Sequence, residues 1–461
     1  MLTATKTLPH VPIWRTLYRV NKIADNPIPF LNEGTKHLGD IFTSYIGPRK
    51  VIVTSNPEYI QHILQKNNKN YHKSKVVKEV LGSQLGQGLL TIDGDYWLKQ
   101  RRLIQPGFYK QRLAELISIM TAETNDFCNE LTRQVAQNPA DDVLKLMMQL
   151  TFRIVNKALF STALDNDKLH RVDYIITNLQ KYVITMARQP YLYPWLKLSG
   201  KVAFYESLRR ETDDIVYGII KERREQKSAY NDLLDMLINS RYEDTGEGMN
   251  NKQLRDESMI LIVAGHETSA NALAWALYLI SQHPEVEQKL LEEAATVLGN
   301  RTPAFEDLPN LQYTRQVIQE TMRLYPPAWI IDRTALEDDE VDGYKIPKDC
   351  ILLLFIYGTH HSPKYWKDPE TFNPDRFSKE NLKDLPNYAY FPFGGGPRLC
   401  IGNNFALFEM QIVLATLLRQ FTFSLQPGQT IDLQPLVTLR PRYGVQMNIA
   451  KRIMATGGQQ V

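Results

Sequence analysis

Apolar residues recur at spacings of three and four between about residues 55 and 325, and this period predicts a mostly helical region. The pattern is clear in "ELISIMTAETNDFCNELTRQV" and "DVLKLMMQLTFRIVNKALF". One helical stretch is unusually long, starting at the capping residues Asn250 and Asn251 and continuing to about His283, before Pro284. About 33 residues at ~1.5 Å each give roughly 50 Å. We expect this helix to cross the whole core.

Strand-like segments flank the helical region. "DIFTSYIGPRKVIV" (40–53) predicts two strands joined at Gly47-Pro48, "YKIPKDCILLLFIYG" predicts a strand pair, and a further β region follows residue 430. "NNFALFEMQIVLATLLRQF" predicts a helix directly after Cys400. Two other segments predict surface loops: "RQPYLYPWLKLSG" (188–200) and "RYEDTGEGMNN" (241–251). The expected fold class is therefore mainly α with small β-sheets (α+β).

Composition narrows the class of protein. The 461 residues include 54 basic and 51 acidic side chains, a net charge of +3 that argues against a general nucleic-acid binder. Three distant cysteines, Cys128, Cys350 and Cys400, form no CxxC pair, which excludes zinc-ribbon and thioredoxin-type sites and fits a reducing compartment. The sequence contains no apolar run long enough for a signal peptide or membrane span, so a soluble cytoplasmic protein is expected.

The segment "FPFGGGPRLCIG" (391–402) concentrates candidate chemistry. Its glycines permit a tight bend, and the predicted helix after Cys400 points N–H groups and its dipole towards the sulfur. With Arg398 nearby, a thiolate suited to metal ligation is expected. A lone cysteine after a glycine turn is also compatible with a small buried core residue. A P-loop is excluded because no Lys-Ser/Thr follows the glycines, whereas a nucleophilic Cys–His enzyme stays open.

The same segment resembles the haem-binding signature of cytochrome P450, FxxGxRxCxG. It matches at Phe393, Gly396, Arg398, Cys400 and Gly402. The resemblance implies haem b, with Cys400 as the thiolate ligand of the iron. It also implies that Phe393 shields the sulfur and that Arg398 pairs with a haem propionate.

Two further segments resemble structural motifs of that family. "ETMR" places Glu320 and Arg323 at i, i+3, which alone is compatible with an ordinary surface ion pair. "FNPDRF" resembles the family's PERF segment, with Asp375 in place of the usual Glu. The resemblance implies a buried network of Glu320, Arg323 and Arg376 that supports the haem-side core without taking part in catalysis.

The long helix contains "AGHETS", Ala264 to Ser269. A zinc HExxH site is excluded because position 270 is alanine, and polar residues facing a partner helix are the plainer interpretation. The resemblance implies an oxygen-activation groove beside the haem at Ala264, where Gly265 lets the helix loosen. Thr268 is then expected to hydrogen-bond dioxygen or water and Glu267 to supply protons. His266 is expected to be structural.

Further basic residues are expected at the haem propionates. Trp97 and Arg101, in "DYWLKQRR", lie at i, i+4 on one helix face, and "PPAWIIDRTA" supplies Arg333. Each arginine alone is equally compatible with a solvated surface charge. The resemblance implies that Trp97, Arg101 and Arg333 bind propionates together with Arg398.

The resemblance covers roughly residues 40 to 450 and implies one cytochrome P450 catalytic domain over 1–461, with the long helix crossing the haem pocket. The β-rich lobe is expected around 40–55, 327–357 and 430–450. The helical lobe is expected at about 55–325 and 402–420.

The implied reaction inserts one atom of dioxygen into a lipophilic molecule. Electrons are expected from a separate ferredoxin or flavodoxin with its reductase, docked on a basic surface that includes Lys99, Arg102, Lys110 and Arg112, and the protein is expected to be a monomer without a nucleic-acid partner. Substrate-lining positions besides Ala264 are expected to be Leu90, Ala328, Trp329, Val437 and Thr438. A medium or long fatty acid is the first expectation, followed by terpenoid, steroid or macrolide-type molecules.

Three other functions stay open on sequence grounds. A haem-thiolate gas sensor or electron carrier needs no proton relay, so the Glu267–Thr268 pair argues against it. A peroxygenase usually lacks this acid–alcohol pair. A haem-free cysteine hydrolase predicts a purified protein without a Soret band.

Overall fold

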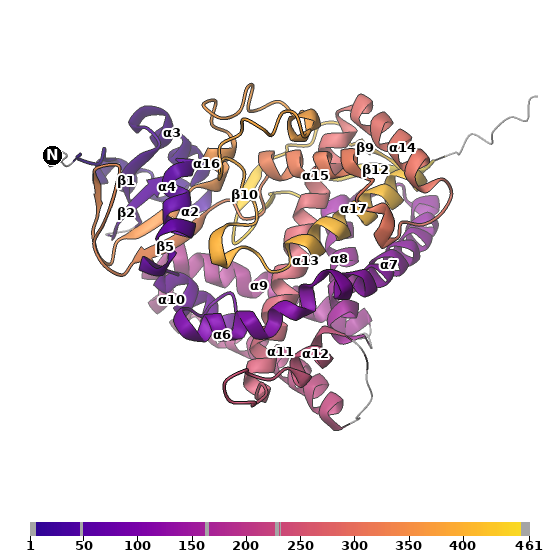
Figure 1. The fold of residues 1–461 in the computed structure, drawn as a ribbon, viewed down its shortest axis with the longest axis horizontal. Coiled ribbons are helices and arrows are strands. Elements are labelled where there is room, and N and C mark those ends of the chain that lie inside the picture. The colour runs from indigo at the N-terminus through magenta and orange to yellow at the C-terminus, as the bar shows by residue number, and fades with distance from the viewer. Residues whose placement is uncertain (1–5, 47–48, 162–165, 226–229, 231, 453–461) are drawn as a thin grey trace, which may run out of the picture.

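Helices form most of the molecule; β1 (Ile41–Ile46), β2 (Arg49–Thr54) and β5 (Ile331–Ala335) lie at one side, where N-terminal strands meet strands from the later part of the chain, whereas β9 (Phe421–Leu425) and β12 (Gln446–Lys451) lie towards the opposite side (Figure 1). The computed structural model describes residues 6–46, 49–161, 166–225, 230 and 232–452. The expected α+β class is confirmed.

The long helix α13 (Asn251–Ser281) has 31 residues, about 46 Å at ~1.5 Å per residue. The Asn250 side chain accepts from the Gln253 backbone N–H, and the Gln253 side chain accepts from the Asn250 N–H, which completes a capping box. The helix ends before Pro284, which begins α14 (Pro284–Leu298). Because α13 is buried around most of its circumference, it crosses the core as predicted.

The helical core surrounds α13. Its most extensive partner is α8 (Val143–Phe160), and it also contacts α15 (Gln312–Leu324) and α17 (Asn403–Gln420). The helix predicted after Cys400 is α17. The other α-helices are α1 (Ile13–Tyr18), α2 (Val20–Asp25), α3 (Ile28–Leu38), α4 (Pro57–Gln61), α5 (Gly82–Leu85), α6 (Gly94–Ile104), α7 (Lys110–Gln137), α9 (Asn166–Arg188), α10 (Tyr193–Leu198), α11 (Lys201–Glu225), α12 (Leu233–Asn239) and α16 (Ile356–His360).

A five-stranded sheet has the order β1-β2-β8-β5-β3, from Ile41–Ile46, Arg49–Thr54, Ile351–Leu354, Ile331–Ala335 and Tyr71–His72. The predicted pair β1 and β2 is antiparallel, and residues 47–48 lie outside the described residues. Alternation along β2 buries Ile52 in one hydrophobic cluster and its neighbours Val51 and Val53 in another. Both faces of the sheet are therefore covered.

The predicted pairing within 344–358 is wrong. β7 (Tyr344–Ile346) pairs with β6 (Asp339–Val341), whereas β8 runs parallel to β2 and antiparallel to β5, and residues from Ile356 onwards are helical. The β region after residue 430 is confirmed as β10 (Leu433–Pro435), β11 (Leu439–Pro441) and β12 (Gln446–Lys451). β12 joins β9 (Phe421–Leu425) and β4 (Ala140–Asp142), and the second of these pairs brings distant parts of the chain together.

The predicted loop at 188–200 is largely helical. α9 continues to Arg188, a 3-10 turn spans Pro190–Leu192, and α10 spans Tyr193–Leu198. The prolines do not break these short helices because each lies in a first turn, where its missing N–H has no partner to lose. The loop at 241–251 is confirmed, with one bridge between Arg241 and Gly248.

Candidate functional site

The Cys400 loop is fixed by close backbone approach. Gly394 and Gly396 adopt positive φ angles of 73° and 64°. A Cβ on Gly396 would lie 1.9 Å from the backbone oxygen of Leu64, so this position requires glycine. The backbone N–H of Cys400 donates to the Phe393 carbonyl at 3.0 Å. These contacts hold the sulfur at the beginning of α17.

The electrostatics of Cys400 differ from the sequence expectation. Its side chain is accessible, yet desolvation within the protein raises the pKa of the thiol, and the Gly402 backbone N–H and Arg101 oppose this only in part. The prediction that the protein by itself favours the thiolate form of Cys400 is thus wrong. The cation that lowers the pKa of the thiol is Arg101, not Arg398. A metal ion that coordinates the sulfur deprotonates it outright, which removes this penalty.

The middle of α13 contains side chains that are accessible to solvent. Ala264 is exposed and Thr268 half-buried, although most of this helix is buried. The Thr268 hydroxyl donates to the Ala264 carbonyl at 2.8 Å, one turn earlier. The expected loosening at Gly265 is absent, since α13 is continuous there. A Cβ on Gly265 would lie 3.0 Å from Val155 of α8, so this glycine allows close helix packing.

The Glu267 side chain has hydrogen-bond partners different from those of its neighbour Thr268. It is 3% exposed, accepts from the Thr438 hydroxyl at 2.7 Å, and accepts from the Gln180 side-chain amide. Asn271 donates to the same Thr438 hydroxyl at 3.0 Å. This buried network joins α13, α9 and the segment between β10 and β11. Sequence reasoning missed Gln180, for which no motif gives a signal.

His266 is structural, as predicted. It is buried, its Nδ1 lies 3.3 Å from the Ile262 carbonyl oxygen, and its ring packs edge-on against Phe152 at 5.1 Å between centroids. The described residues contain no group of His, Cys, Asp and Glu that would hold a metal ion by itself.

Basic side chains gather around Arg398. It pairs with Asp93, and its guanidinium carbon lies 5.4 Å from the centroid of the Trp97 ring. Arg333 is 9% exposed, and burial together with repulsion from Arg398 lowers its pKa to about 10. Burial and the same repulsion lower the pKa of Lys73 to about 7. The site therefore holds two buried basic groups, Arg333 and Lys73, whose positive charge is disfavoured by the partly buried Arg398 beside them.

This cluster fits an anionic ligand such as a haem propionate. Arg398 Nη1 is buried and forms no hydrogen bond with any residue described in the structure. Such a donor is costly unless a partner is supplied, and a carboxylate would satisfy it while offsetting the mutual repulsion. Lys73 and Asp93 were missed by sequence reasoning; Asp93 precedes α6 in "TIDGDYW", where an aspartate before a helix could have signalled its place.

Trp97 and Arg101 lie on α6, as predicted. Trp97 is 8% exposed, and Arg101 Nη1 donates to the Leu399 carbonyl at 2.9 Å, next to Cys400. The pair therefore connects α6 to both the cysteine loop and Arg398. Phe393, whose carbonyl receives the Cys400 N–H, is partly buried against the helical core.

The predicted substrate-lining residues have unequal environments. Leu90 is 37% exposed, and Ala328 and Val437 are half-buried. Trp329 is 5% exposed, packs in the cluster beside α3, and donates from Nε1 to the Leu436 carbonyl at 3.1 Å. Thr438 is 6% exposed and held by Glu267 and Asn271. The tryptophan is thus a core residue, and the threonine belongs to the Glu267 network.

The predicted structural network is confirmed. Glu320 and Arg323 are fully buried, and Arg323 donates to both carboxylate oxygens at 2.6 and 2.8 Å. Arg376 donates to Glu320 Oε1 at 3.2 Å. The network joins α15 to the segment that precedes the cysteine loop.

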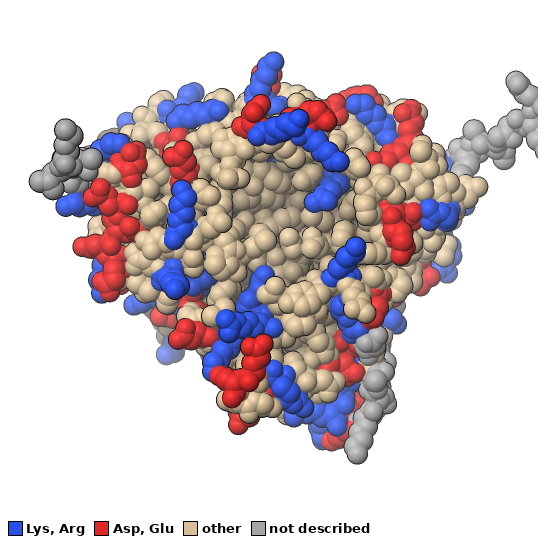
Figure 2. All heavy atoms as spheres, viewed as in Figure 1, with Lys and Arg blue, Asp and Glu red and all other residues tan. Residues whose placement is uncertain are grey.

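The predicted basic docking surface carries less free charge than expected. Lys99 pairs with Asp244 at 2.5 Å, Arg112 pairs with Glu115, and Lys110 lies over the Phe305 ring. Basic and acidic side chains are interspersed on the face in Figure 2, whose hollowed centre is lined by uncharged residues. No single-sign surface dominates this view.

Comparisons with known proteins identify the family of the chain. A family model described as "Cytochrome P450" matches residues 6–448. The chain is 33% identical over 418 residues to cyclooctatin synthase from Streptomyces melanosporofaciens, covering 90% of each protein. It is 30% identical to cyclooctat-9-en-7-ol 5-monooxygenase of that organism, covering 88% of this chain and 87% of the relative. Protein LUTEIN DEFICIENT 5, chloroplastic, from Arabidopsis thaliana is 31% identical, covering 90% and 72%.

Among the helices of the described residues, none combines the length and apolar character needed to cross a bilayer.

Proposed function

The chain belongs to the cytochrome P450 family, whose members are haem b monooxygenases, and from this premise we propose that it inserts one oxygen atom from dioxygen into a lipophilic small molecule. The observation that carries the proposal is the accessible Cys400 sulfur, held at the beginning of α17 near Arg398, whose buried Nη1 forms no hydrogen bond with a described residue although the side chain pairs with Asp93. The catalytic domain is proposed to span 1–461.

Haem with a cysteine thiolate ligand supplies the activation of dioxygen when bound. Cys400 is the proposed ligand, which the backbone bond to Phe393 and the Gly396 turn hold in position. Arg398, Arg333, Arg101 and Trp97 are proposed to hold the propionates, together with Lys73. The Phe393 ring is proposed to shield the sulfur from water, and Ala264 to leave room for the porphyrin.

Thr268 and Glu267 are the proposed proton-handling residues. The Thr268 hydroxyl is half-exposed, and it can turn from the Ala264 carbonyl to donate to an oxygen-bearing ligand or water. Glu267 is buried against Thr438 and Gln180, so it holds its proton or charge away from bulk water. A water molecule or a rotation of Glu267 is needed to connect the two residues.

A lipophilic substrate is supported by the apolar residues proposed to line its site, Leu90, Ala264, Ala328 and Val437. A medium or long fatty acid is our first candidate. A cyclic alcohol is the second candidate, because the relative named cyclooctat-9-en-7-ol 5-monooxygenase acts on one by its name. Trp329 and Thr438 are proposed to shape the site from behind these residues.

Electrons are proposed to come from a separate ferredoxin or flavodoxin with its reductase. Of the four basic residues considered for docking, Arg102 is exposed and forms no ion pair with a described residue, so it is the best remaining contact. We further propose a monomeric, cytoplasmic enzyme.

The haem-ligand assignment is tested by Cys400→Ser, with Cys350→Ser as a matched control outside the loop. The Cys400 variant is expected to lose the thiolate band of the carbon monoxide complex, while the control retains it. Retention of that band in Cys400→Ser would remove Cys400 as the ligand.

Turnover and substrate class need a second experiment. Purified holoenzyme is titrated with fatty acids and with cyclic alcohols, and Soret shifts identify ligands that are then tested for oxidation with surrogate redox partners. Product formation supports the monooxygenase. Binding without turnover would favour a haem sensor, and fast turnover with hydrogen peroxide alone would favour a peroxygenase.

A further inference from the structure

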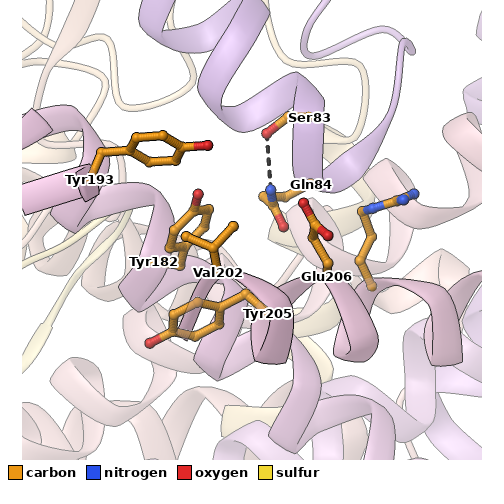
Figure 3. A pocket seen from close by; sticks show the side chains of 8 residues that line it. Ser83, Gln84, Tyr182, Tyr193, Val202, Tyr205 and Glu206 are labelled. Atoms are coloured by element: carbon orange, nitrogen blue, oxygen red, sulfur yellow. Dashed lines mark hydrogen bonds between the residues drawn. The ribbon is translucent and has the colours of Figure 1, made fainter. Parts of the chain in front are cut away.

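A pocket of about 320 Å³ lies between α5, α9, α10 and α11 (Figure 3). Its eight lining residues are Ser83, Gln84, Tyr182, Tyr193, Val202, Tyr205, Glu206 and Arg209. None of them belongs to the cysteine loop, the Arg398 cluster or the accessible segment of α13. The volume lies within the range of small-molecule sites.

Three tyrosines give the pocket aromatic walls. The rings of Tyr182 and Tyr205 stack with centroids 4.7 Å apart and an interplanar angle of 30°. Burial raises the pKa of Tyr182, and Tyr193, Glu206 and Tyr205 add to the shift because their negative charge would disfavour a phenolate beside them. The three phenols and the carboxylate are thus electrostatic neighbours. The faces of such rings attract cations.

Gln84 provides a buried acceptor without a donor. It is 7% exposed, and its Nε2 donates to Ser83 Oγ at 2.9 Å, while Ser83 Oγ donates to the Val80 carbonyl at 2.8 Å. The amide is therefore oriented by its nitrogen, and Oε1 forms no hydrogen bond with the residues that the structure describes. Figure 3 shows this oxygen turned away from Ser83 and towards the side of Glu206.

The two charged residues of the pocket, Arg209 and Glu206, differ in how well an ion-pair partner compensates their charge. Arg209 donates to Asp213 at 2.8 Å, so a carboxylate already accompanies its positive charge. Glu206 has only a loose contact with Arg210, at 3.8 Å, in which the two side chains are 53% and 72% exposed. Such an exposed pair contributes little. Glu206 therefore leaves the pocket with an available negative charge.

We propose that this pocket binds the primary ammonium group of an organic amine with an aromatic or cyclic body. The ammonium N–H groups donate to Gln84 Oε1 and to the Glu206 carboxylate, and its charge lies against the tyrosine rings. An anion is disfavoured by Glu206. A purely apolar molecule leaves the Gln84 oxygen without a donor. None of the pocket's lining residues is assigned to the proposed oxidation site, and this inference does not depend on that assignment.

Calorimetric titration of the holoenzyme tests this site with four probes of similar size: benzylammonium, benzyltrimethylammonium, benzyl alcohol and benzoate. The Soret band is recorded in parallel, so that amine ligation to the haem iron is identified as a separate event. Benzylammonium is expected to bind the pocket about tenfold more tightly than benzyl alcohol, with benzoate weakest.

Two substitutions separate the contributions of charge and hydrogen bonding. Glu206→Gln is expected to weaken both cations about tenfold, whereas Gln84→Met weakens benzylammonium but leaves benzyltrimethylammonium, which has no N–H, unchanged. Asp214→Asn is the matched control, an exposed carboxylate on α11 that does not line the pocket.

Circular dichroism checks that each variant is folded. Equal binding of benzyl alcohol and benzylammonium, or unchanged cation affinity in Glu206→Gln, would overturn the proposal. Cation binding that survives in both pocket variants, but disappears when the iron is ligated by carbon monoxide, would assign the event to the haem side and equally overturn it. None of these outcomes affects the test with Cys400→Ser.

Discussion

Thr268 and Glu267 are adjacent in sequence but occupy different surroundings. The Thr268 hydroxyl lies on the accessible side of α13 and bonds only within its own helix turn, whereas Glu267 is buried against α9 and Thr438. Their roles should therefore separate on substitution.

Thr268→Ala removes the hydroxyl without disturbing any partner outside α13. We expect correct folding and unchanged substrate affinity, but a several-fold rise in the fraction of electrons recovered as hydrogen peroxide, because the proton donor next to the reaction is lost. Product and peroxide are measured against donor consumed. Thr268→Ser, which keeps the hydroxyl, is the control. Unchanged coupling in the alanine variant would transfer the role to another group.

Glu409 of α17 is a buried carboxyl group that no motif singled out. It is 0% exposed, and desolvation raises its pKa from 4.5 to about 8, with Ser269 of α13 only partly opposing the shift. Because the folded state binds the proton more tightly than the unfolded state, this group stabilises the fold most at low pH, and the contribution is lost as pH rises from 4.5 to about 8.

Glu409→Gln keeps the size and polarity but removes the titration. We expect the variant to gain stability over the wild-type protein progressively as pH rises through this window, measured as the free energy of unfolding in urea. Glu285→Gln, at an exposed carboxylate on α14, should show no such trend. Parallel pH profiles of wild type and Glu409→Gln would mean that the carboxyl group is not protonated in the fold.

Residue-level prediction from the sequence succeeded where a short motif carried the information. Glu320, Arg323 and Arg376 meet as predicted because their spacing belongs to a recognisable pattern. Lys73, Gln180 and Glu409 were missed, since their burial depends on elements distant in sequence. The direction of the Cys400 pKa was also wrong, because desolvation depends on the surrounding fold and local charge patterns do not reveal it.

Among the elements, α13 was the most predictable. Its caps at Asn250 and its end before Pro284 are local signals, and they fix both of its ends. The 188–200 segment was mistaken for a loop because prolines usually break helices, yet here they lie in first turns. β7 and β8 are sequence neighbours that joined different sheets, and a pairing with a strand some hundreds of residues away leaves no local signal.

The Gly396 turn is the element that most tightly controls the position of Cys400. Gly396→Ala would place a Cβ 1.9 Å from the Leu64 oxygen in a left-handed backbone conformation. We expect the loop to shift and the purified protein to contain much less haem, measured by absorbance relative to protein, with nearly unchanged far-ultraviolet circular dichroism.

Gly428→Ala is the matched control for this prediction. Its φ of 78° imposes similar strain, of about 1 kcal/mol, but no atom lies within 4 Å of the added Cβ. Normal haem content in Gly396→Ala would show that the loop tolerates displacement. A similar loss in both variants would show that general destabilisation, rather than the Leu64 contact, is responsible.

At the scale of the whole molecule, a helical core adjoins a lobe whose sheet combines β1, β2 and β3 with β5 and β8 (Figure 1). The period of the hydrophobic residues predicted the helical and the strand-rich regions. It did not predict how the strands assemble into sheets, because sheet order depends on long-range pairing. Recognition of the motifs in their order supplied the architecture that local patterns lacked. The Glu320 network is one set of such long-range contacts, since it links α15 to α16 and to the segment that contains Thr371 and Arg376.

Arg323 connects more separate segments than its ion pair alone indicates. Besides Glu320, it donates to the backbone carbonyls of His360, Pro369 and Thr371 at 2.9, 2.7 and 3.2 Å. Its planar guanidinium donates hydrogen bonds simultaneously to α15, to α16 and to the segment that leads towards the cysteine loop. A lysine ammonium group does not reproduce this arrangement of donors.

Arg323→Lys is therefore expected to leave Glu320 and several carbonyls poorly satisfied at a fully buried site. A loss of about 3 kcal/mol in the free energy of unfolding is expected, because a single ammonium group cannot replace all the N–H donors of the guanidinium, and each buried acceptor left without a donor costs about 1–3 kcal/mol. Haem retention should fall with it, since the network adjoins the chain leading to Cys400. Arg376→Lys, where a 3.2 Å bond at the network's edge is changed, should cost clearly less. Equal stabilities of Arg323→Lys and wild type would mean that apolar packing holds these segments together and that the arginine is dispensable for their association.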